Sequence, residues 1–373
     1  MITLDKLTKI FDTPNGSITA ADHISMEVPT GEICVLLGPS GCGKTTTLKM
    51  VNRIIPATSG RVLIHGEDTS QMNTVDLRRN IGYVIQQIGL FPNMTIEDNI
   101  SVVPKLLGWS AEKYKKRALE LLDLVALDPA IFLKRYPSEL SGGQQQRVGV
   151  IRALAADPKV MLMDEPFGAI DPINREVIQD EFLKMQKELQ KTILFVSHDI
   201  DEAVKMGDKI AIFREGKLEQ YAAPDDLLAH PANDFIAGFV GNDRTLKRLQ
   251  LVTAGEVMQQ NPSMVTLDQP LDEALQLMES RDLEAVTVVN REQKPIGMVR
   301  REIAQVHRGS CRDHHDGLPT VIYQDDDLRS VVSRLYRVDA SWLPVVDGEG
   351  YLQGVITQRG ITHHVGATYR TQA

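Results

Sequence analysis

A glycine-rich turn at residues 38–45, with the sequence GPSGCGKT, has the residue types and spacing of a phosphate-binding loop. Glycines let successive backbone N–H groups curl around phosphate oxygens, and the helix expected to start near Lys44 adds the positive end of its dipole. Lys44 would contact the β- and γ-phosphates, and the Thr45 hydroxyl would bind magnesium. A chance glycine-rich turn is a poor alternative, because the match is complete and lies between an apolar run and a helix. The nucleotide contacts that we expect here come from Gly38, Pro39, Ser40, Gly41, Cys42, Gly43, Lys44, Thr45 and Thr46.

Two adjacent carboxylates follow a second apolar run, at residues 160–163. Asp164 is placed to hold a magnesium ion, since carboxylate oxygens are preferred ligands of that metal. Glu165 would point toward the terminal phosphate and act as the general base that polarises the attacking water. An Asp-Glu pair alone is common after an apolar run, but together with the phosphate loop it predicts phosphoryl transfer to water.

A third stretch, residues 140–147 (LSGGQQQR), opens a helix whose apolar positions Val148, Ile151 and Ala155 share one face. Its serine and glycines leave N–H groups and a hydroxyl free at a helix N-terminus, which predicts a second phosphate site. An ordinary glycine-capped helix is the alternative. The contacts expected from this stretch come from Ser141, Gly142, Gly143 and Gln144.

The elements that must position these residues belong to an α/β domain, because short apolar runs alternate with amphipathic helical stretches through residues 1–241. The runs at 33–37 and 160–163 are expected to be strands buried on both faces of a largely parallel sheet. Both carry their chemistry at the carboxyl end, where open α/β sheets bind ligands. Residues 242–252 are mostly polar and basic, and we place a linker or a short connecting helix there.

The rest of the chain is an internal repeat with an offset of 57 residues, as Pro262 and Pro319 illustrate. Apolar residues at helical spacing start at Leu271 and again at Leu328, and each helix is followed by two strand-like segments. The repeat predicts a duplicated β-α-β-β unit, with a first copy at 253–310 and a second at 311–366.

Composition excludes several functional classes. A net charge of -9 argues against a nucleic-acid partner, which would need a basic face. The three cysteines suggest neither a disulfide framework nor a zinc ribbon, so a reducing cytosol is the expected compartment. The N-terminus has no signal-peptide pattern, and no apolar stretch approaches the ~20 residues that span a bilayer. Any role at a membrane is therefore expected to depend on partner chains.

The segment LSGGQ at residues 140–144 resembles the signature of ATP-binding cassette (ABC) ATPases. In that family, the signature of one subunit closes on the ATP that the phosphate loop of the other subunit holds. The resemblance implies an ABC-type nucleotide-binding domain with a helical signature subdomain, ATP as substrate, Mg²⁺ as cofactor and a homodimer with shared sites.

Other family elements follow in the expected order. Phe11 resembles the aromatic residue that stacks on adenine, although read alone it fits a core or edge position. Gln86 resembles the Q-loop glutamine that contacts magnesium and water and relays the nucleotide state to a membrane partner, and Gln87 leaves the register open by one residue. Asp171 ends a stretch that resembles the D-loop, with isoleucine where leucine is usual. His198 resembles the switch histidine that contacts the γ-phosphate; a lone histidine after a strand would otherwise be structural.

Residues 81–92, 103–107 and 181–184 resemble the ATP-binding subunits of bacterial glycine betaine/carnitine/choline importers. The resemblance implies transmembrane permease subunits, an extracytoplasmic substrate-binding subunit and a peripheral place on the cytoplasmic face of the plasma membrane. An importer for another solute, such as an amino acid, is the first alternative. A cassette protein that acts on ribosomes or DNA is the second, but it would need a second cassette, a heptad insertion or a basic arm.

The duplicated tail is similar to a pair of cystathionine-β-synthase (CBS) domains. Nucleotide-binding members carry Thr or Ser and then Asp after the glycine of the second strand. Here the first copy has Arg300 and Ile303 in those places, and the second has Thr357 and Gly360. A structural role or a different ligand is therefore at least as consistent with the tail as AMP or ATP.

A basic segment connects the two copies and allows three interpretations. It is a solvated surface, a metal site of Cys311, His314 and His315, or an anion site. In related importers the CBS pair responds to ionic strength or cyclic di-AMP, which motivates the anion site and a regulatory role. The basic residues are Arg300, Arg301, His307, Arg308, Arg312, His314 and His315, against Glu302 and Asp313.

Overall fold

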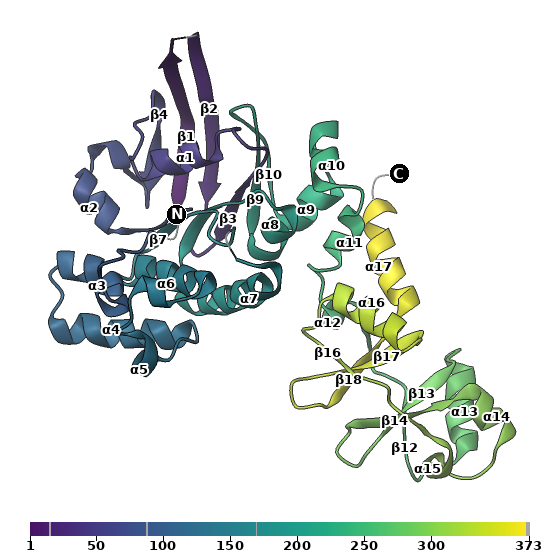
Figure 1. The fold of residues 1–373 in the computed structure, drawn as a ribbon. Helices are drawn as coiled ribbons and strands as arrows, with labels where there is room; N and C mark the ends of the chain where they lie inside the picture. Colours follow the sequence, from purple (N-terminus) through teal and green to yellow (C-terminus); the bar gives the residue numbers. More distant parts are fainter. Residues whose placement is uncertain (15, 87–88, 169, 371–373) are drawn as a thin grey trace. The chain divides into compact units, whose positions relative to one another are not determined.

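The computed structural model of the chain describes residues 1–14, 16–86, 89–168 and 170–370. It divides into two compact units, Met1–Gly241 (unit 1) and Asn242–Ala373 (unit 2), which we describe separately (Figure 1). Among the described residues, no helix has both the length and the apolar character that crossing a membrane requires.

Unit 1 is built on a six-stranded sheet in which five neighbouring strands run parallel and the edge strand β10 is antiparallel. Strands β3, β7 and β8 are buried at every residue, as the continuous apolar runs predict for strands covered on both faces. The order places the carboxyl ends of β3, β8 and β7 side by side. The sheet comprises β10 (Lys217–Ala222), β9 (Lys209–Arg214), β3 (Ile33–Leu37), β8 (Thr192–Val196), β7 (Val160–Asp164) and β6 (Ile81–Val84).

Helices pack on this sheet from segments that connect its strands. Helix α1 (Lys44–Val51) contacts β7 and β8, and α8 (Ile200–Met206) contacts β3. The long α7 (Pro172–Leu189) connects β7 to β8. After the sheet, α9 (Pro224–Ala229) and α10 (Asp234–Val240) complete unit 1.

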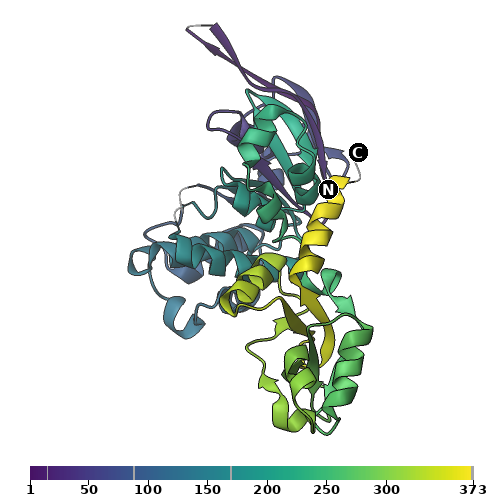
Figure 2. The same cartoon turned by 90° about the vertical axis from the view of Figure 1, so that its right-hand side faces the viewer.

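A second, antiparallel sheet joins β2 (Gly16–Val28), β1 (Ile2–Thr13), β4 (Ser59–Ile64) and β5 (Glu67–Asp68). One apolar cluster contains residues of both sheets and of α1, so the two sheets share a core around that helix. Figure 2 shows the far end of the β1–β2 hairpin projecting beyond the rest of unit 1.

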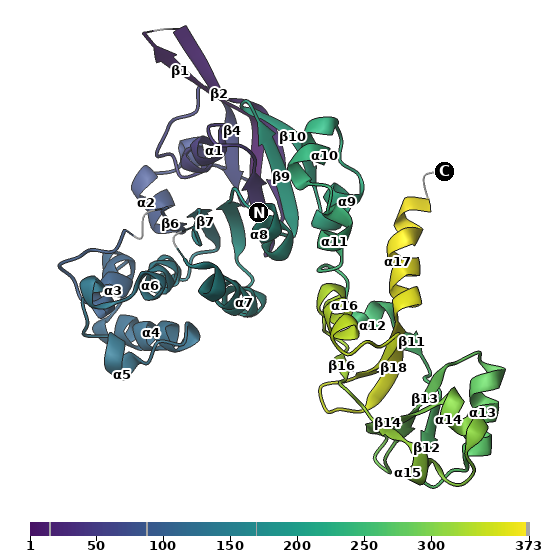
Figure 3. The ribbon, with the colours of Figure 1, turned by 45° about the vertical axis from the view of Figure 1, so that its right-hand side comes forward.

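A helical subdomain lies beside the six-stranded sheet, where α6 contacts both α3 and the edge strand β6 (Figure 3). It is inserted between β6 and β7, and α2 (Thr74–Arg79) precedes β6. This subdomain confirms the fold class that the sequence predicts for unit 1. Its helices are α3 (Ile96–Leu106), α4 (Ala111–Leu124), α5 (Pro129–Phe132) and α6 (Gly142–Leu154).

Unit 2 contains two four-stranded sheets with the same local plan, which confirms the duplicated β-α-β-β unit. Module A is the sheet of β12 (Met264–Thr266), β13 (Ala285–Val289), β14 (Pro295–Arg300) and β15 (Asp316–Gly317) with α13 (Leu271–Ser280) and α14 (Arg301–Val306). Module B is the sheet of β11 (Gln259–Gln260), β18 (Leu352–Thr357), β17 (Trp342–Val346) and β16 (Ile322–Tyr323) with α16 (Leu328–Arg337) and α17 (Gln358–Arg370). Three shorter helices are α11 (Arg244–Arg248), α12 (Ala254–Val257) and α15 (Cys311–His314). Figure 3 shows α13 and α14 beside the sheet of module A, α16 beside the sheet of module B, and α17 extending from the end of β18.

The modules divide the chain at different residues from the copies 253–310 and 311–366 that the repeat suggests. Strand β11 pairs with β18, and Ala254 is buried in the core of module B together with Leu249 from the expected linker. Conversely, Cys311 is buried in the core of module A, and β15 pairs with β14. Each sheet therefore takes one of its two edge strands from the residue range expected for the other copy.

Candidate active site

The phosphate loop lies between β3 and α1, where two of its glycines are required by close approach. Gly38 and Gly43 have φ angles of +144° and +104°, which side chains disfavour. A Cβ at Gly38 would collide with the carbonyl of Phe213, and one at Gly43 with the carbonyl of Ala20. Inside the loop, the buried Lys44 Nζ donates to the carbonyls of Gly38 at 2.6 Å and Pro39 at 2.9 Å.

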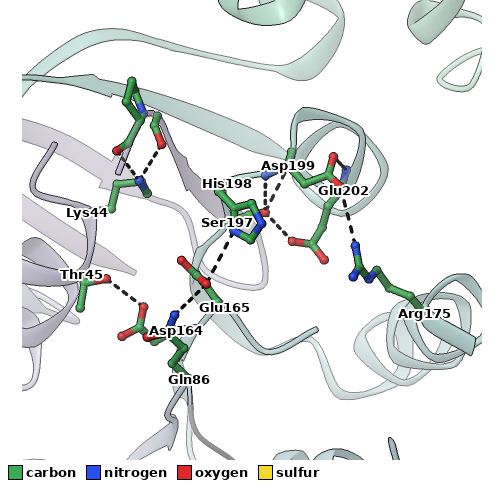
Figure 4. A network of polar contacts seen from close by, with 12 residues as sticks. Lys44, Thr45, Gln86, Asp164, Glu165, Arg175, Ser197, His198, Asp199 and Glu202 are labelled. Carbon is green, nitrogen blue, oxygen red and sulfur yellow. Dashed lines mark hydrogen bonds and ion pairs between the residues drawn. The ribbon is translucent and has the colours of Figure 1, made fainter. Parts of the chain in front are cut away.

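Asp164 faces the phosphate loop from the end of β7. The Thr45 hydroxyl donates to its Oδ1 at 3.0 Å (Figure 4). Burial raises the pKa of Asp164, and the neighbouring Glu165 raises it further, while the hydrogen bond from Thr45 and the charges of Lys49 and Lys44 lower it. A buried carboxylate beside a hydroxyl oxygen and a second carboxylate is suited to a divalent cation, so these residues fit Mg²⁺.

Two of the predicted site residues lie close to one carboxylate oxygen of Glu165. Gln86 Nε2 donates to Glu165 Oε2 at 2.9 Å, and His198 Nδ1 lies 3.6 Å from the same oxygen (Figure 4). Gln86 follows β6, Glu165 follows β7 and His198 follows β8, so the parallel sheet brings three distant segments together. The alternative Q-loop residue, Gln87, lies outside the described residues.

The backbone of Glu165 has a φ of +48°, in the left-handed region that few residues other than glycine adopt. Its N–H donates to the carbonyl of Val196 at 3.0 Å, which ties it to the end of β8. Strained backbone of this kind concentrates at functional sites. It turns the chain sharply after Asp164, so that the two carboxylates occupy different positions.

A polar network behind His198 was not predicted from the sequence. The hydroxyl of Ser197 makes a short hydrogen bond to Glu202, and Gln179 Nε2 donates to Glu202 Oε1 at 3.0 Å. The pattern Asp199-x-x-Glu202 signals a capping box, in which the glutamate would reach back to the Asp199 N–H. Instead that N–H donates to Ser197 Oγ at 3.0 Å.

The signature stretch forms the N-terminus of α6. Ser141 Oγ accepts from the N–H of Gln144 at 3.4 Å, and Gln144 Oε1 accepts from the N–H of Ser141 at 2.9 Å, so the helix starts with a capping box. Ser141 and Gly142 are exposed, and a Cβ at Gly142 would meet nothing within 4 Å. The surface at this helix start is open to another molecule.

Phe11 is exposed on β1, which excludes the core position that its sequence also allowed. It pairs with Ile18 on β2, two residues before Ala20, whose carbonyl packs against Gly43 of the phosphate loop. The aromatic ring therefore belongs to a strand pair that borders the loop. Contact with adenine stays a prediction.

In the D-loop stretch, Ala169 lies outside the described residues and Asp171 is exposed. Ile170 is buried, and its carbonyl accepts from Arg175 Nη2 at 3.0 Å. The structure thus connects this stretch to the first turn of α7.

Four arginines of the basic segment of unit 2 are engaged with aspartates of module A. The four ion pairs are Arg300–Asp316 at 3.2 Å, Arg301–Asp282 at 3.5 Å, Arg308–Asp272 at 2.9 Å and Arg312–Asp268 at 2.6 Å. Local charge is therefore largely balanced, which favours the solvated-surface interpretation. Sequence patterns did not indicate this arrangement, because the paired residues are far apart along the chain, as are Asp268 and Arg312, whose positions differ by 44 residues.

The structure also argues against the metal interpretation of this segment. Cys311 is buried in the apolar core of module A, and burial raises the pKa of its thiol. His314 stacks on His307 with ring centroids 4.8 Å apart. Within the described residues, no three His, Cys, Asp or Glu side chains are grouped to hold a metal ion.

Comparison with known proteins gives two family matches. The model for "ABC transporter" matches residues 21–168, and the model for "CBS domain" matches residues 254–303 and 319–367. The chain is 57% identical to the osmoprotectant import ATP-binding protein OsmV of Salmonella typhimurium, over 98% of this chain and 97% of that protein. It is 45% identical to the glycine betaine/carnitine/choline transport ATP-binding protein OpuCA of Bacillus subtilis, over 97% of this chain and 95% of that protein.

Solved structures resemble unit 1. The dimeric structure of MJ0796, a bacterial ABC transporter cassette, aligns with a TM-score of 0.55 and 35% identity, and it covers 60% of this chain and 98% of that one. A second dimeric structure of MJ0796, in a post-hydrolysis state with ADP and Pi, aligns with a TM-score of 0.55 and 34% identity.

Proposed function

Because the chain belongs to the ABC transporter family of ATP-binding proteins, we propose that it is the ATP-hydrolysing subunit of an osmoprotectant importer. Relatives named for import of osmoprotectants, or of glycine betaine, carnitine and choline, match it over almost its full length, CBS domains included. The observation that carries the ATPase activity is the convergence of Gln86 and His198 on one oxygen of Glu165, beside the phosphate loop.

In the proposed reaction, Glu165 accepts a proton from the water that attacks the γ-phosphate, while the bond from the γ-phosphorus to the bridging oxygen breaks and ADP leaves. Gln86 and His198 hold its carboxylate in place, and His198 would also contact the γ-phosphate. Lys44 and the N–H groups of the loop bind the β- and γ-phosphates, and Phe11 stacks on adenine. Thr45, Gln86 and Asp164 would hold Mg²⁺, which neutralises charge on the phosphates.

We propose that two copies of the chain form two composite sites. Each site joins residues Gly38–Thr46 of one subunit to Ser141, Gly142, Gly143 and Gln144 of the other, with Asp171 at the junction. The open N-terminus of α6 and the dimeric MJ0796 structures support this arrangement.

The proposed partners are transmembrane permease subunits and an extracytoplasmic substrate-binding subunit. The chain would lie peripherally on the cytoplasmic face of the plasma membrane. Cyclic di-AMP is a proposed regulator at unit 2, where a cleft of about 810 Å³ is lined by both modules, including Arg281, Arg301, Thr287, Thr357 and Arg359. Arginine and hydroxyl groups suit a phosphate-bearing ligand.

The substrate class is testable in proteoliposomes that contain the chain with its co-purified permease and substrate-binding subunits. We expect glycine betaine, carnitine or choline to stimulate ATP hydrolysis and to be taken up, whereas amino acids such as glutamine leave both unchanged. Uptake of an amino acid without a quaternary amine would assign the importer to another solute. Recovery of the chain with ribosomes or DNA, and without membrane subunits, would contradict a transport role.

A further inference from the structure

The carboxylate of Glu202 holds the loop that carries His198 by a hydrogen bond from Ser197. Ser197 is 1% exposed, and its hydroxyl donates to Glu202 in the first turn of α8. Because the hydroxyl proton is committed to Glu202, the oxygen of Ser197 is free to accept the N–H of Asp199 at 3.0 Å. These two bonds bracket His198 on both sides and define the turn from which its ring projects toward Glu165 (Figure 4).

Glu202 also bonds to the helix that follows the D-loop stretch. Gln179, 4% exposed on α7, donates to Glu202 Oε1 at 3.0 Å. One carboxylate thus accepts donors from both the His198 loop and α7, which is possible because an ionised carboxylate has two acceptor oxygens and no proton. Burial raises the pKa of Glu202 and Asp199 raises it further, while Ser197, Gln179 and the charge of Arg175 lower it.

A second contact, between Asp199 and Arg175, also joins the His198 loop to α7. Arg175 on α7 lies 3.9 Å from Asp199 Oδ2 and donates to the carbonyl of Ile170 at 3.0 Å. Asp199 in turn caps α8 by accepting from the N–H groups of Asp201 at 2.9 Å and Glu202 at 3.4 Å. The His198 loop and the residues after Glu165 are therefore joined by side chains, although they lie in separate strand-to-helix connections.

We propose that Glu202 is a positioning residue for ATP hydrolysis, which holds the His198 loop through Ser197 and couples it to α7 through Gln179. The proposal rests on the role proposed above for His198. Glu202 does not touch the substrate, and its effect on the reaction passes through the placement of the His198 ring. Displacing a reacting group by about 1 Å costs on the order of 100-fold in rate.

The test compares steady-state ATP hydrolysis of full-length variants in the assembled transporter. Glu202→Ala should lower kcat by about 10- to 100-fold while the KM for ATP changes less than about threefold, since the phosphate loop is untouched. Glu202→Gln keeps the shape and one acceptor oxygen, so its kcat should fall by only about 3- to 10-fold. Glu188→Ala, the same change at an exposed glutamate of α7, should leave kcat unchanged.

A double-mutant cycle tests whether Glu202 acts on the His198 loop through Ser197. If Glu202 acts through Ser197, adding Ser197→Ala to Glu202→Ala should produce little further loss of kcat. Fully multiplicative losses would overturn the route through Ser197. Thermal melting checks the fold of each variant, and should Glu202→Ala not fold, the Glu202→Gln variant decides, because a wild-type kcat in it would overturn the proposal.

His198→Ala and Glu165→Gln, measured in parallel, separate this inference from the proposed function. If both lose turnover while Glu202→Ala retains it, the positioning role is wrong and the ATPase site stands. If His198→Ala retains wild-type turnover, the role of His198 is wrong, and the inference falls with it.

Discussion

At the scale of single residues, the unusual backbone of Glu165 explains how two adjacent carboxylates do different work. Asp164 continues the strand and faces Thr45, whereas the positive φ of Glu165 turns its carboxylate toward Gln86 and His198. In an ordinary strand, neighbouring side chains would point to opposite faces of the sheet. The turn instead keeps both at its carboxyl edge, one suited to a cation and one to a water molecule.

The first prediction follows from the role of Glu165 as general base. Glu165→Gln should keep ATP binding, because the amide can still form a hydrogen bond, but it should reduce turnover by about 100- to 10,000-fold, because an amide is a far poorer base. Nucleotide binding by filtration, turnover by phosphate release and dimer content by size-exclusion chromatography with ATP would show an ATP-bound dimer that accumulates. A hydrolysis rate equal to that of the wild type would remove Glu165 from this role.

The residues of the site were predictable from sequence where a motif implies a fixed backbone. The phosphate loop is one example, since its spacing dictates how Lys44 and Thr45 follow the glycines. Ser197 and Glu202 were not predictable as partners, because their contact depends on how α8 departs from β8. The capping pattern at Asp199 indicates a helix start but not which oxygen the Asp199 N–H binds.

At the scale of elements, the strand order explains the site better than any single motif. Apolar runs predict that β3, β7 and β8 are buried, yet a run of that kind does not say which strand is its neighbour. In the order β3-β8-β7, the strand that precedes His198 lies between the strand that precedes the phosphate loop and the strand that precedes Glu165. Long-range pairing of this sort depends on the packing of the whole unit, so sequence patterns alone left it open.

Helix α6 supplies the second prediction, because its N-terminus is exposed on unit 1. If sites are shared between subunits, mixing a Lys44→Ala chain with a Ser141→Arg chain yields heterodimers with one intact and one doubly damaged site. Such heterodimers should bind ATP at a single site, whereas each variant homodimer has both sites damaged. Separately tagged chains, purified in tandem, allow the stoichiometry of bound nucleotide to be measured.

The Ser141→Arg homodimer serves as the control for that experiment. Arginine at the helix start would occupy the open surface and oppose closure, while the capping bond of Ser141 is worth only about 1 kcal/mol to the fold. Two fully functional sites in this homodimer would mean that the signature acts somewhere other than on the partner's nucleotide.

At the scale of the whole molecule, the exchange of edge strands makes unit 2 one folded body. The repeat predicts two equal copies, but β11 pairs with β18 and β15 with β14, so each module includes an edge strand from the residue range of the other copy. The periodicity of the repeat reports helices and strands locally and carries no information on which sheet an edge strand joins. A cut at residue 253 would leave Leu249 without the core in which it is buried.

The third prediction separates the tail from its basic segment as the source of regulation. Deleting residues 242–373, at the boundary of the two units, should leave basal ATP hydrolysis in the assembled transporter but abolish its response to salt or cyclic di-AMP. A ligand can regulate only by binding one state more tightly than the other. Because the cleft proposed for cyclic di-AMP lies in unit 2, its binding should also be lost. Unchanged control after this deletion would assign unit 2 to bracing the dimer.

Replacing Arg300, Arg308 and Arg312 by Gln supplies the matched variant, and Arg301 is kept because it lines the cleft proposed for cyclic di-AMP. Each of these three arginines already pairs with an aspartate, and exposed pairs of this kind contribute about 0 to 1 kcal/mol each, so module A should lose a little stability and keep its fold. We therefore expect the variant to respond to salt nearly as the wild type does, with an unchanged affinity for ATP. If it instead loses the response while thermal melting shows a folded unit 2, the ion pairs are the sensor. In that case the signal would be the screening of these paired charges by salt, since exposed charges interact over a Debye length of ~8 Å at physiological ionic strength.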